Sequence, residues 1–240
     1  MKKKKAFTLA EVLITLGIIG VVAAMTLPSL IIKYRHKELQ VGLQKAYSNV
    51  SQAYLLTKSQ LGVDNIHKTY TYYDASKGGY IYSNDFINAF YKNLKVVKTI
   101  TAQSYLNFNN TNKTTPSSCG TSCPHITKIL PDGSGIGAFV NSATIYLYVD
   151  TNGPYKGPNR MGFDAFSFYV TTKDKIMPIK SGDQYGTCDE DGEGSDACTM
   201  SYPCSATLKQ AANGMGCAWF AINDISPVDE KYSYWDNLPK

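Results

Sequence analysis

The side chains best suited to holding a metal ion lie in one glycine- and proline-rich stretch in the second half of the chain. Asp150 and Asn152 alternate as at the start of a calcium-binding loop, and Asn159 and Asp164 follow before the sequence becomes apolar again. Carboxylate and amide oxygens are ligands that Ca²⁺ prefers in proteins. The stretch is therefore a candidate calcium site made of these four residues.

Two features of the same stretch favour a structural explanation. Pro154 and Lys156 stand where an EF-hand would have ligands, and no glutamate closes the loop. Asp150 and Asn152 can also form Asx-turns with Gly153 and Pro154. The sequence favours turns over calcium, so no cofactor is expected, and calcium stays open as the alternative for this stretch.

Six cysteines form a second group with chemical potential, and all of them follow residue 118. An even number is typical of disulfides in an oxidising compartment. Nearness along the chain favours the pairs Cys119–Cys123, Cys188–Cys198 and Cys204–Cys217. Cys119, Cys123 and His125 could instead begin a zinc site, although no second ligand pair with zinc-finger spacing follows.

Motifs for catalysis are missing from the sequence. The three histidines, His36, His67 and His125, are scattered. No serine or cysteine motif of the nucleophile-elbow or papain type is present, and no glycine-rich loop leads into a Lys-Ser/Thr pair. We therefore expect a protein that is not an enzyme.

The element that organises the rest of the chain lies at its start. Lys2 to Lys5 precede an apolar run, Phe7 to Ile32, which contains a single charge, Glu11. A helix of about 20 apolar residues crosses a bilayer, so this run is long enough to span one. A carboxylate inside such a helix costs a few kcal/mol unless a partner compensates it. Because the run contains no basic residue, we expect that partner to be an amino group created by cleavage on a neighbouring subunit.

Two further features distinguish this run from a plain anchor or a secretory signal. A secretory signal is cut after its apolar region, whereas here the junction between polar and apolar residues falls at Ala6-Phe7, and a cut there keeps the whole helix. Pro28 also lies inside the run, after Gly17 and Gly20. Proline opposes a straight helix, which suits a helix that bends or unwinds locally among other copies.

The string Ala6-Phe7-Thr8-Leu9-Ala10-Glu11, the apolar run, Gly20 and Pro28 resemble the class III signal of type IV pilins and type II secretion pseudopilins. The resemblance implies that a prepilin peptidase cuts after Ala6 and methylates the new amino group of Phe7. It implies that Glu11 meets a neighbour's amine and that Pro28 marks the point where the filament helix kinks or melts. The family most often has glycine before the cut, so Ala6 predicts slower processing.

The same resemblance implies partners and a location. The partners are prepilin peptidase, other copies and related pilin subunits, an inner-membrane assembly platform, and membrane lipid before assembly. Lys2 to Lys5 favour a cytoplasmic N-terminus over the competing basic cluster at 33–37, which predicts a single pass through the inner membrane and a head in the periplasm or outside the cell. Without those four lysines the formal charge falls from +5 to +1, so nucleic-acid binding by the mature protein is not expected.

Beyond the apolar run the helix is expected to continue as an amphipathic one. Apolar residues recur at steps of three and four: Leu39, Leu43, Ala46 or Tyr47, Val50, Ala53 or Tyr54, and Leu61. Gly62 is a suitable stop. One helix over 7–61 would be about 80 Å long, with 7–32 in the membrane and the second half packed on a globular head. Two helices separated near Pro28 are the alternative.

The head, residues 62–240, is expected to have two parts. A loop-rich connection occupies 62–135 and contains a short helix that follows an N-cap at Ser83 and ends near Lys95. The part from 136 to 240 is β-rich and stapled by disulfides, with candidate strands at 143–149, 165–170, 175–179 and 217–222. Such strands between Gly, Pro and Asn turns indicate an antiparallel meander. The expected fold class is α+β and pilin-like, with a long N-terminal helix packed on a small antiparallel sheet.

These observations predict a structural subunit of a pilus or pseudopilus filament, processed by prepilin peptidase and assembled through its N-terminal helix. Two other functions stay open. One is a minor pilin whose head binds DNA or a surface ligand. The other is a single-span, membrane-anchored exported protein.

Overall fold

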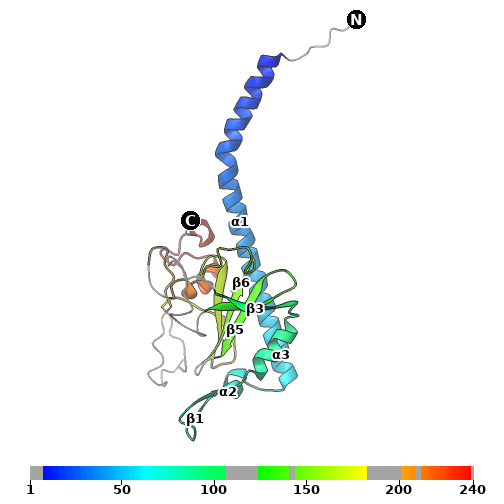
Figure 1. Ribbon diagram of the computed structural model, residues 1–240. Coiled ribbons are helices and arrows are strands. Elements are labelled where there is room, and N and C mark those ends of the chain that lie inside the picture. The colour runs from blue at the N-terminus through cyan, green and yellow to red at the C-terminus, as the bar shows by residue number, and fades with distance from the viewer. Residues whose placement is uncertain (1–7, 106–123, 141–143, 183–201, 209–211, 239–240) are drawn as a thin grey trace. The chain divides into compact units, whose positions relative to one another are not determined.

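The computed structural model describes residues 8–105, 124–140, 144–182, 202–208 and 212–238. One unit comprises residues 1–38 and a second comprises residues 39–240. From here on the second unit, which adds residues 39–61 to the predicted head, is called the head. In chain order the elements are α1 (Leu9–Leu61), α2 (Ile66–Tyr70), β1 (Thr71–Asp74), β2 (Gly79–Tyr82), α3 (Asp85–Asn93), β3 (Lys98–Tyr105), β4 (His125–Ile129), β5 (Gly135–Val140), β6 (Ile145–Asp150), β7 (Ala165–Val170), β8 (Ile176–Pro178), η2 (Met215–Cys217), α5 (Ala218–Asn223) and η3 (Trp235–Asn237) (Figure 1).

α1 confirms the single long helix that the sequence predicts. It continues through Pro28, so the alternative of two separate helices is wrong. It ends at Leu61, immediately before Gly62, whose φ of +62° is a conformation that glycine adopts without steric cost. The second half of this helix belongs to the head.

The second half of α1 buries one stripe of side chains in the head. Its members recur at steps of three and four; they are Leu39, Leu43, Ala46, Val50, Ala53, Tyr54 and Thr57. Leu61, the last predicted member, is only half-buried. Tyr47, beside the stripe, stacks on Phe168 of β7 with the ring centroids 5.3 Å apart. Full burial of one Leu or Val side chain contributes about 1.5–3 kcal/mol, so this stripe is a major attachment of α1 to the sheet.

Six strands form one antiparallel sheet in the order β3-β4-β5-β6-β7-β8. Sheet neighbours are also neighbours along the chain, which confirms the predicted meander. β7 has the predicted bounds, whereas β6 and β8 both begin later than expected. The register pairs Asp150 with Ala165, which brings the two ends of the 151–164 loop together. The long helix followed by this sheet confirms the predicted α+β, pilin-like fold class.

β6 is buried on both faces because it lies between two apolar clusters. Ile145, Leu147 and Val149 face the cluster that contains the α1 stripe. Tyr146 and Tyr148 face a second cluster, which the segments around Met161 and Met215 cover. A strand buried on both faces shows little polar alternation, which agrees with the continuous apolar and aromatic character of this stretch.

The strand predicted at 217–222 is wrong, because these residues form the end of η2 and most of the helix α5. A short continuous apolar run fits a buried helix as well as a strand. β8 already forms the edge of the sheet beside β7. The Trp219 N–H donates to the Ile179 carbonyl at 3.2 Å, and Trp235 Nε1 donates to the Ala221 carbonyl at 2.9 Å. α5 is thus packed between the end of β8 and η3.

The segment 62–135, expected to be a loop-rich connection, contains α2, the β1–β2 hairpin, α3 and two strands of the main sheet, β3 and β4. The N-cap of α3 is Asn84 rather than Ser83, and the Ser83 hydroxyl instead accepts from the Asp85 N–H at 3.2 Å. Asn93 at the end of α3 donates to the Thr57 hydroxyl at 2.9 Å. α3 therefore packs beside the last turns of α1, as Figure 1 also shows.

Asp174, in the β7–β8 turn, holds the end of α1. Its Oδ1 accepts from the Tyr54 hydroxyl at 2.5 Å and from the Ile66 N–H at 2.6 Å, and its Oδ2 pairs with Lys58. Burial alone would raise the pKa of Asp174, but the bonds from Lys58, Tyr54 and the Ile66 N–H outweigh burial and lower it. One carboxylate thus ties this turn to α1 and to the start of α2.

Asp174→Asn should lower the free energy of unfolding of the full chain by about 1–3 kcal/mol at pH 7, because bonds to a charged group are lost. Asparagine tolerates the left-handed backbone at this position, where φ is 64°. Urea unfolding in a mild detergent, followed by tryptophan fluorescence, measures the change. Asp64→Asn is the matched control, since Asp64 is exposed and its replacement should change stability by less than about 0.5 kcal/mol.

The effect of Asp174→Asn should depend on pH in one direction. The folded pKa of Asp174 is lowered, so its stabilisation is complete above the unfolded value of about 3.9 and is lost as the pH falls through the folded value. The difference between wild type and variant should therefore shrink in acid. Equal stabilities at neutral pH would contradict the role assigned to this carboxylate.

Candidate functional site

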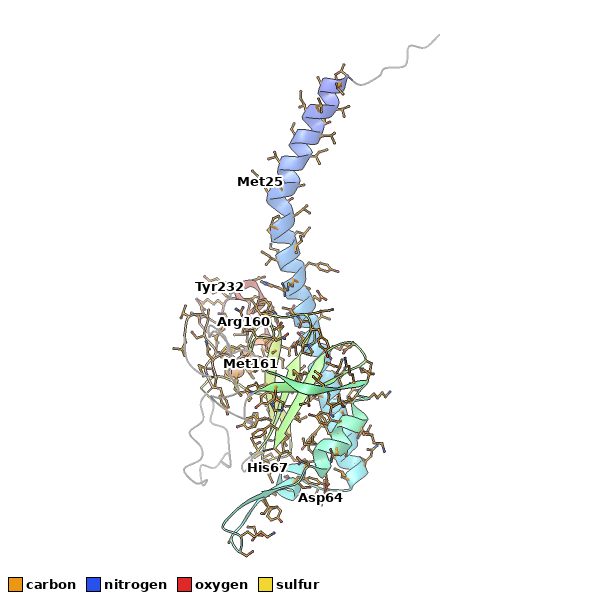
Figure 2. The ribbon with its side chains drawn as sticks, in the orientation of Figure 1. Met25, Asp64, His67, Arg160, Met161 and Tyr232 are labelled. Atoms are coloured by element: carbon orange, nitrogen blue, oxygen red, sulfur yellow. A yellow bond between two sulfur atoms is a disulfide. The ribbon has the colours of Figure 1, made fainter. Side chains whose placement is uncertain are left out.

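The first half of α1 is apolar and exposed along nearly its whole length. Leu13, Ile18 and Met25 are at least 60% exposed, and Figure 2 shows Met25 among side chains that project from the helix in several directions. Within the part of the chain that the structure describes, α1 is the one helix long and apolar enough to cross a membrane. A contiguous apolar surface of this size marks a site for contact with lipid or other proteins.

Glu11 closes a capping box with Thr8 at the start of α1. The Thr8 N–H and hydroxyl donate to Glu11 Oε2 at 2.8 and 2.9 Å, and the Glu11 N–H donates to Thr8 Oγ1 at 3.3 Å. Such reciprocal bonds satisfy backbone donors that a helix start leaves unpaired. The spacing Thr8-x-x-Glu11 is the sequence signature of this motif, and it gives Glu11 a partner within its own chain. Ala6 and Phe7, the predicted cleavage and methylation residues, lie outside the described residues.

Gly20 and Pro28 also lie in the first half of α1. A Cβ added to Gly20 would meet no atom within 4 Å, so no contact within the described chain explains a glycine there. α1 is unbroken at Pro28. The local melting that the family resemblance implies at Pro28 is not a property of α1 in this structure, and the roles of both residues in assembly stay predictions.

Asp164 holds the middle of the 151–164 loop together. It has no exposed surface. Its Oδ1 accepts from the Arg160 N–H at 2.7 Å, and its Oδ2 accepts from the Asn159 N–H at 3.0 Å. The Asn152 side-chain amide donates to the same Oδ2 at 3.3 Å. The structure therefore brings two of the other three predicted calcium ligands, Asn152 and Asn159, to the Asp164 carboxylate.

Asp150, the fourth predicted ligand, is fully buried at the end of β6. Its Oδ1 accepts from the Gly153 N–H at 2.9 Å, a turn contact of the kind that the sequence favours. Its Oδ2 has no hydrogen-bond partner, and the same is true of the buried Oδ1 atoms of Asn152 and Asn159. Turn formation thus accounts for one oxygen of Asp150 and leaves three buried oxygens in this loop unpaired.

Burial raises the pKa of both carboxyl groups. For Asp150, burial is the main cause and the nearby Asp164 carboxylate adds to it, which raises the pKa to about 7 against the opposing effect of the Gly153 N–H. For Asp164, burial outweighs the hydrogen bonds from the Arg160 and Asn159 N–H groups, so its pKa is raised as well. Two ionised carboxylates are therefore unfavourable in this loop without a further positive charge.

The 151–164 loop is in close contact with two other parts of the head. A Cβ added to Gly42 of α1 would lie 3.3 Å from the Thr151 Cβ, and a Cβ on Gly153 would lie 2.1 Å from the Gly133 carbonyl oxygen. The second distance is far inside van der Waals contact, so no larger residue fits at 153. The start of the loop is consequently held between α1 and the β4–β5 turn.

The other end of the loop packs on the Cys204–Cys217 disulfide, which confirms that predicted pair. A Cβ on Gly162 would lie 2.9 Å from Cys217 Sγ, and the buried Tyr234 hydroxyl donates to the Gly162 carbonyl at 2.5 Å. Figure 2 labels Arg160 and Met161, the two residues that precede Gly162 in the chain. The remaining predicted disulfide residues lie outside the described residues; they are Cys119, Cys123, Cys188 and Cys198.

The zinc alternative gains no support from the described residues. His125 is buried in β4, and its two proposed cysteine partners lie outside the described ranges. No group of three or more His, Cys, Asp or Glu side chains suited to a metal occurs in the part of the chain that the structure covers. The Asp150–Asp164 loop combines two carboxylates with two amides, so it is a different kind of ligand set.

Two recesses on the described part of the head bear on ligand binding. One, of about 470 Å³, is lined by the disulfide, Val228, Tyr232 and Tyr234, and its only charged lining residue is Asp229. The other, of about 410 Å³, contains Lys45 and Lys95 but no aromatic residue, and Lys45 pairs with Asp132 at 2.9 Å. Neither recess combines basic and aromatic side chains, which a groove for nucleic acid requires.

Comparison with known proteins gives one match, at the start of the chain. Residues 1–27 match the family model of the prokaryotic N-terminal methylation motif. No curated protein and no solved structure matches the chain. The matched residues include Ala6, Phe7 and Glu11 and end just before Pro28. Together with the exposed apolar half of α1, this match establishes that the chain carries the prepilin-type signal of type IV pilins and pseudopilins.

Proposed function

We propose that this protein is a structural, non-enzymatic subunit of a pilus or pseudopilus filament. The observation that carries the proposal is the apolar first half of α1, which is exposed in the single chain and whose residues up to Leu27 lie within the match to the N-terminal methylation motif. In the membrane, lipid covers this surface. In a filament, the apolar helices of other copies and related subunits replace the lipid.

Assembly follows from repetition of one contact. The prepilin peptidase cuts between Ala6 and Phe7 and methylates Phe7, while Lys2 to Lys5 keep the leader on the cytoplasmic side of the inner membrane. An assembly platform in that membrane then adds subunits one at a time. The surface on one copy differs from the surface that it meets on the next, and when the rotation between copies does not close a ring, such a contact gives an open helical filament.

The capping box supports a specific part for Glu11 in this process. Oε2 of Glu11 is held beside the Thr8 N–H, and Thr8 directly follows Phe7 in the sequence. The carboxylate is therefore held near the end of the helix, where the amino group of a neighbouring mature chain can approach it. The bonds from Thr8 reduce the cost of the carboxylate in lipid, and the methylated amine of a neighbour neutralises its charge in the filament.

Intact-mass spectrometry of protein purified from its native cells tests the processing step. We expect the mature chain to lack residues 1–6 and to carry one added methyl group on Phe7. Cells without the prepilin peptidase should yield the full-length chain, which serves as the control. A mature species that begins at Met1 in peptidase-positive cells would overturn the proposal.

Substitution of Glu11 tests the assembly step. Glu11→Ala and Glu11→Gln should both enter the membrane and be cleaved, because the cut site is untouched. Recovery of filaments after shearing should fall at least tenfold, which corresponds to about 1.4 kcal/mol per contact, since a neighbour's buried amine loses its counter-charge. Glu38→Gln is the matched control, because Glu38 is an exposed carboxylate on the same helix beyond the apolar run.

Two comparisons separate charge from capping. Glu11→Gln keeps an oxygen that can accept from the Thr8 N–H, whereas Thr8→Val removes the hydroxyl and keeps the charge. We expect the Thr8 variant to assemble better than the Gln variant. If Glu11→Gln assembles like wild type, charge pairing is not the driving force, and if Glu11→Ala does so as well, α1 acts only as an anchor.

A further inference from the structure

We propose that the 151–164 loop binds one calcium ion, with Asp150 Oδ2, Asn152 Oδ1 and Asn159 Oδ1 as direct ligands and Asp164 beside them. The proposal concerns the head alone and does not depend on the filament role. It rests on three buried oxygen atoms without partners in one loop and on two fully buried carboxylates at the ends of that loop.

The amide nitrogens of the two asparagines show that their oxygens are left for another partner. Asn152 Nδ2 donates to Asp164 Oδ2 at 3.3 Å and to the Gly157 carbonyl at 3.4 Å. Asn159 Nδ2 donates to the Pro154 carbonyl at 2.8 Å. These bonds fix which end of each amide is nitrogen, because an oxygen could not donate to a carbonyl. Both Oδ1 atoms are consequently acceptors that are buried without a donor.

A cation satisfies this loop better than a proton or a water molecule does. A proton on Asp150 could bond to one of the two amide oxygens and would leave the other unpaired. A buried water could donate two hydrogen bonds but would bring no positive charge to Asp150 and Asp164. Unpaired buried acceptors and charges are both costly. A divalent cation can bind all three oxygens and neutralise both carboxylates.

The ligand chemistry favours calcium over other divalent ions. The atoms available are carboxylate and amide oxygens, without histidine or cysteine among them, which disfavours zinc. Magnesium requires a nearly regular octahedron and keeps several waters. Calcium accepts six to eight oxygens in irregular geometry, neutral carbonyl oxygens and water among them, so the side chains of this loop do not have to complete its coordination shell.

Calcium at this position would stabilise the head as a whole. The loop touches α1 through Thr151, the β4–β5 turn through Gly153 and the disulfide through Gly162, so an ion that holds its two ends together fixes several contacts at once. Ligands that bind only the folded state raise its stability by mass action. The proposal therefore predicts a folded state whose stability depends on calcium.

The test uses the full chain in mild detergent, freed of metal with EGTA and then dialysed. Isothermal titration with calcium chloride should show a site with a dissociation constant between about 10⁻⁵ and 10⁻³ M. Thermal unfolding followed by circular dichroism should shift upward by about 5 °C or more at saturating calcium. Magnesium chloride at the same concentration should give a clearly smaller shift. Equal unfolding temperatures in EGTA and in calcium, or equal shifts with both metals, would overturn the proposal.

Two variants assign the ion to this loop. Asp150→Asn removes the buried charge and keeps the shape, so it should abolish the calcium shift and unfold in EGTA at a temperature equal to or above that of wild type. Asn152→Ala removes one ligand oxygen and only long hydrogen bonds, and should weaken calcium binding at least tenfold. Asn152→Ala also tests the assignment on its own if the Asp150→Asn variant does not fold.

Asp229→Asn is the matched control, because Asp229 is exposed and accepts a comparable turn bond, from the Lys231 N–H at 3.0 Å. It should respond to calcium like wild type. If Asp150→Asn or Asn152→Ala also responds fully, the ion binds elsewhere and the assignment to the 151–164 loop is wrong.

Discussion

The packing of the second half of α1 against the meander is the constraint on which the rest of the head depends. The buried stripe from Leu39 to Thr57 is continuous with the apolar face of the sheet, and Tyr47 stacks directly on Phe168. Its end is held in register by Asp174, which receives bonds from α1 and α2 together. Because the sheet is a meander, each strand is positioned by its neighbour in the chain, and the contact between Tyr47 and Phe168 holds β7 against the helix.

One helix therefore serves two environments. In its second half only one stripe is buried and the exposed side is mostly polar, with Val41 and Leu55 among its exposed apolar residues, which is close to the pattern of a helix on a water-soluble head. In its first half nearly every side chain is apolar and exposed, which requires lipid or other subunits. The free start of such a helix has no neighbouring element of the described chain to satisfy its donors, and the Thr8–Glu11 capping box does this locally. The same carboxylate is then available to a neighbouring chain.

The 151–164 loop adds two carboxylates to the buried residues of the head. Asp150 and Asp164 have no exposed surface. Most of their bonds are to backbone N–H groups of the loop itself, which shapes the loop but does not neutralise the carboxylates. The Cys204–Cys217 disulfide and Tyr234 close over its far end. Rigid packing around an incompletely satisfied polar centre is the arrangement from which an ion site is inferred.

The sequence by itself determined the features that depend on long or local patterns. The stripe spacing and Gly62 predicted α1, the alternation of Ala165–Val170 predicted β7, and Cys204–Cys217 followed from nearness along the chain. Tertiary structure decided the rest. The apolar run at 217–222 fits a strand or a buried helix by pattern alone, and its packing between the end of β8 and η3 made it helical. β3 is rich in polar residues, and its strand structure depends on pairing with β4. The four residues of the candidate ion site were recognisable as a group, but which oxygens stay unpaired depends on bonds that only the folded loop makes.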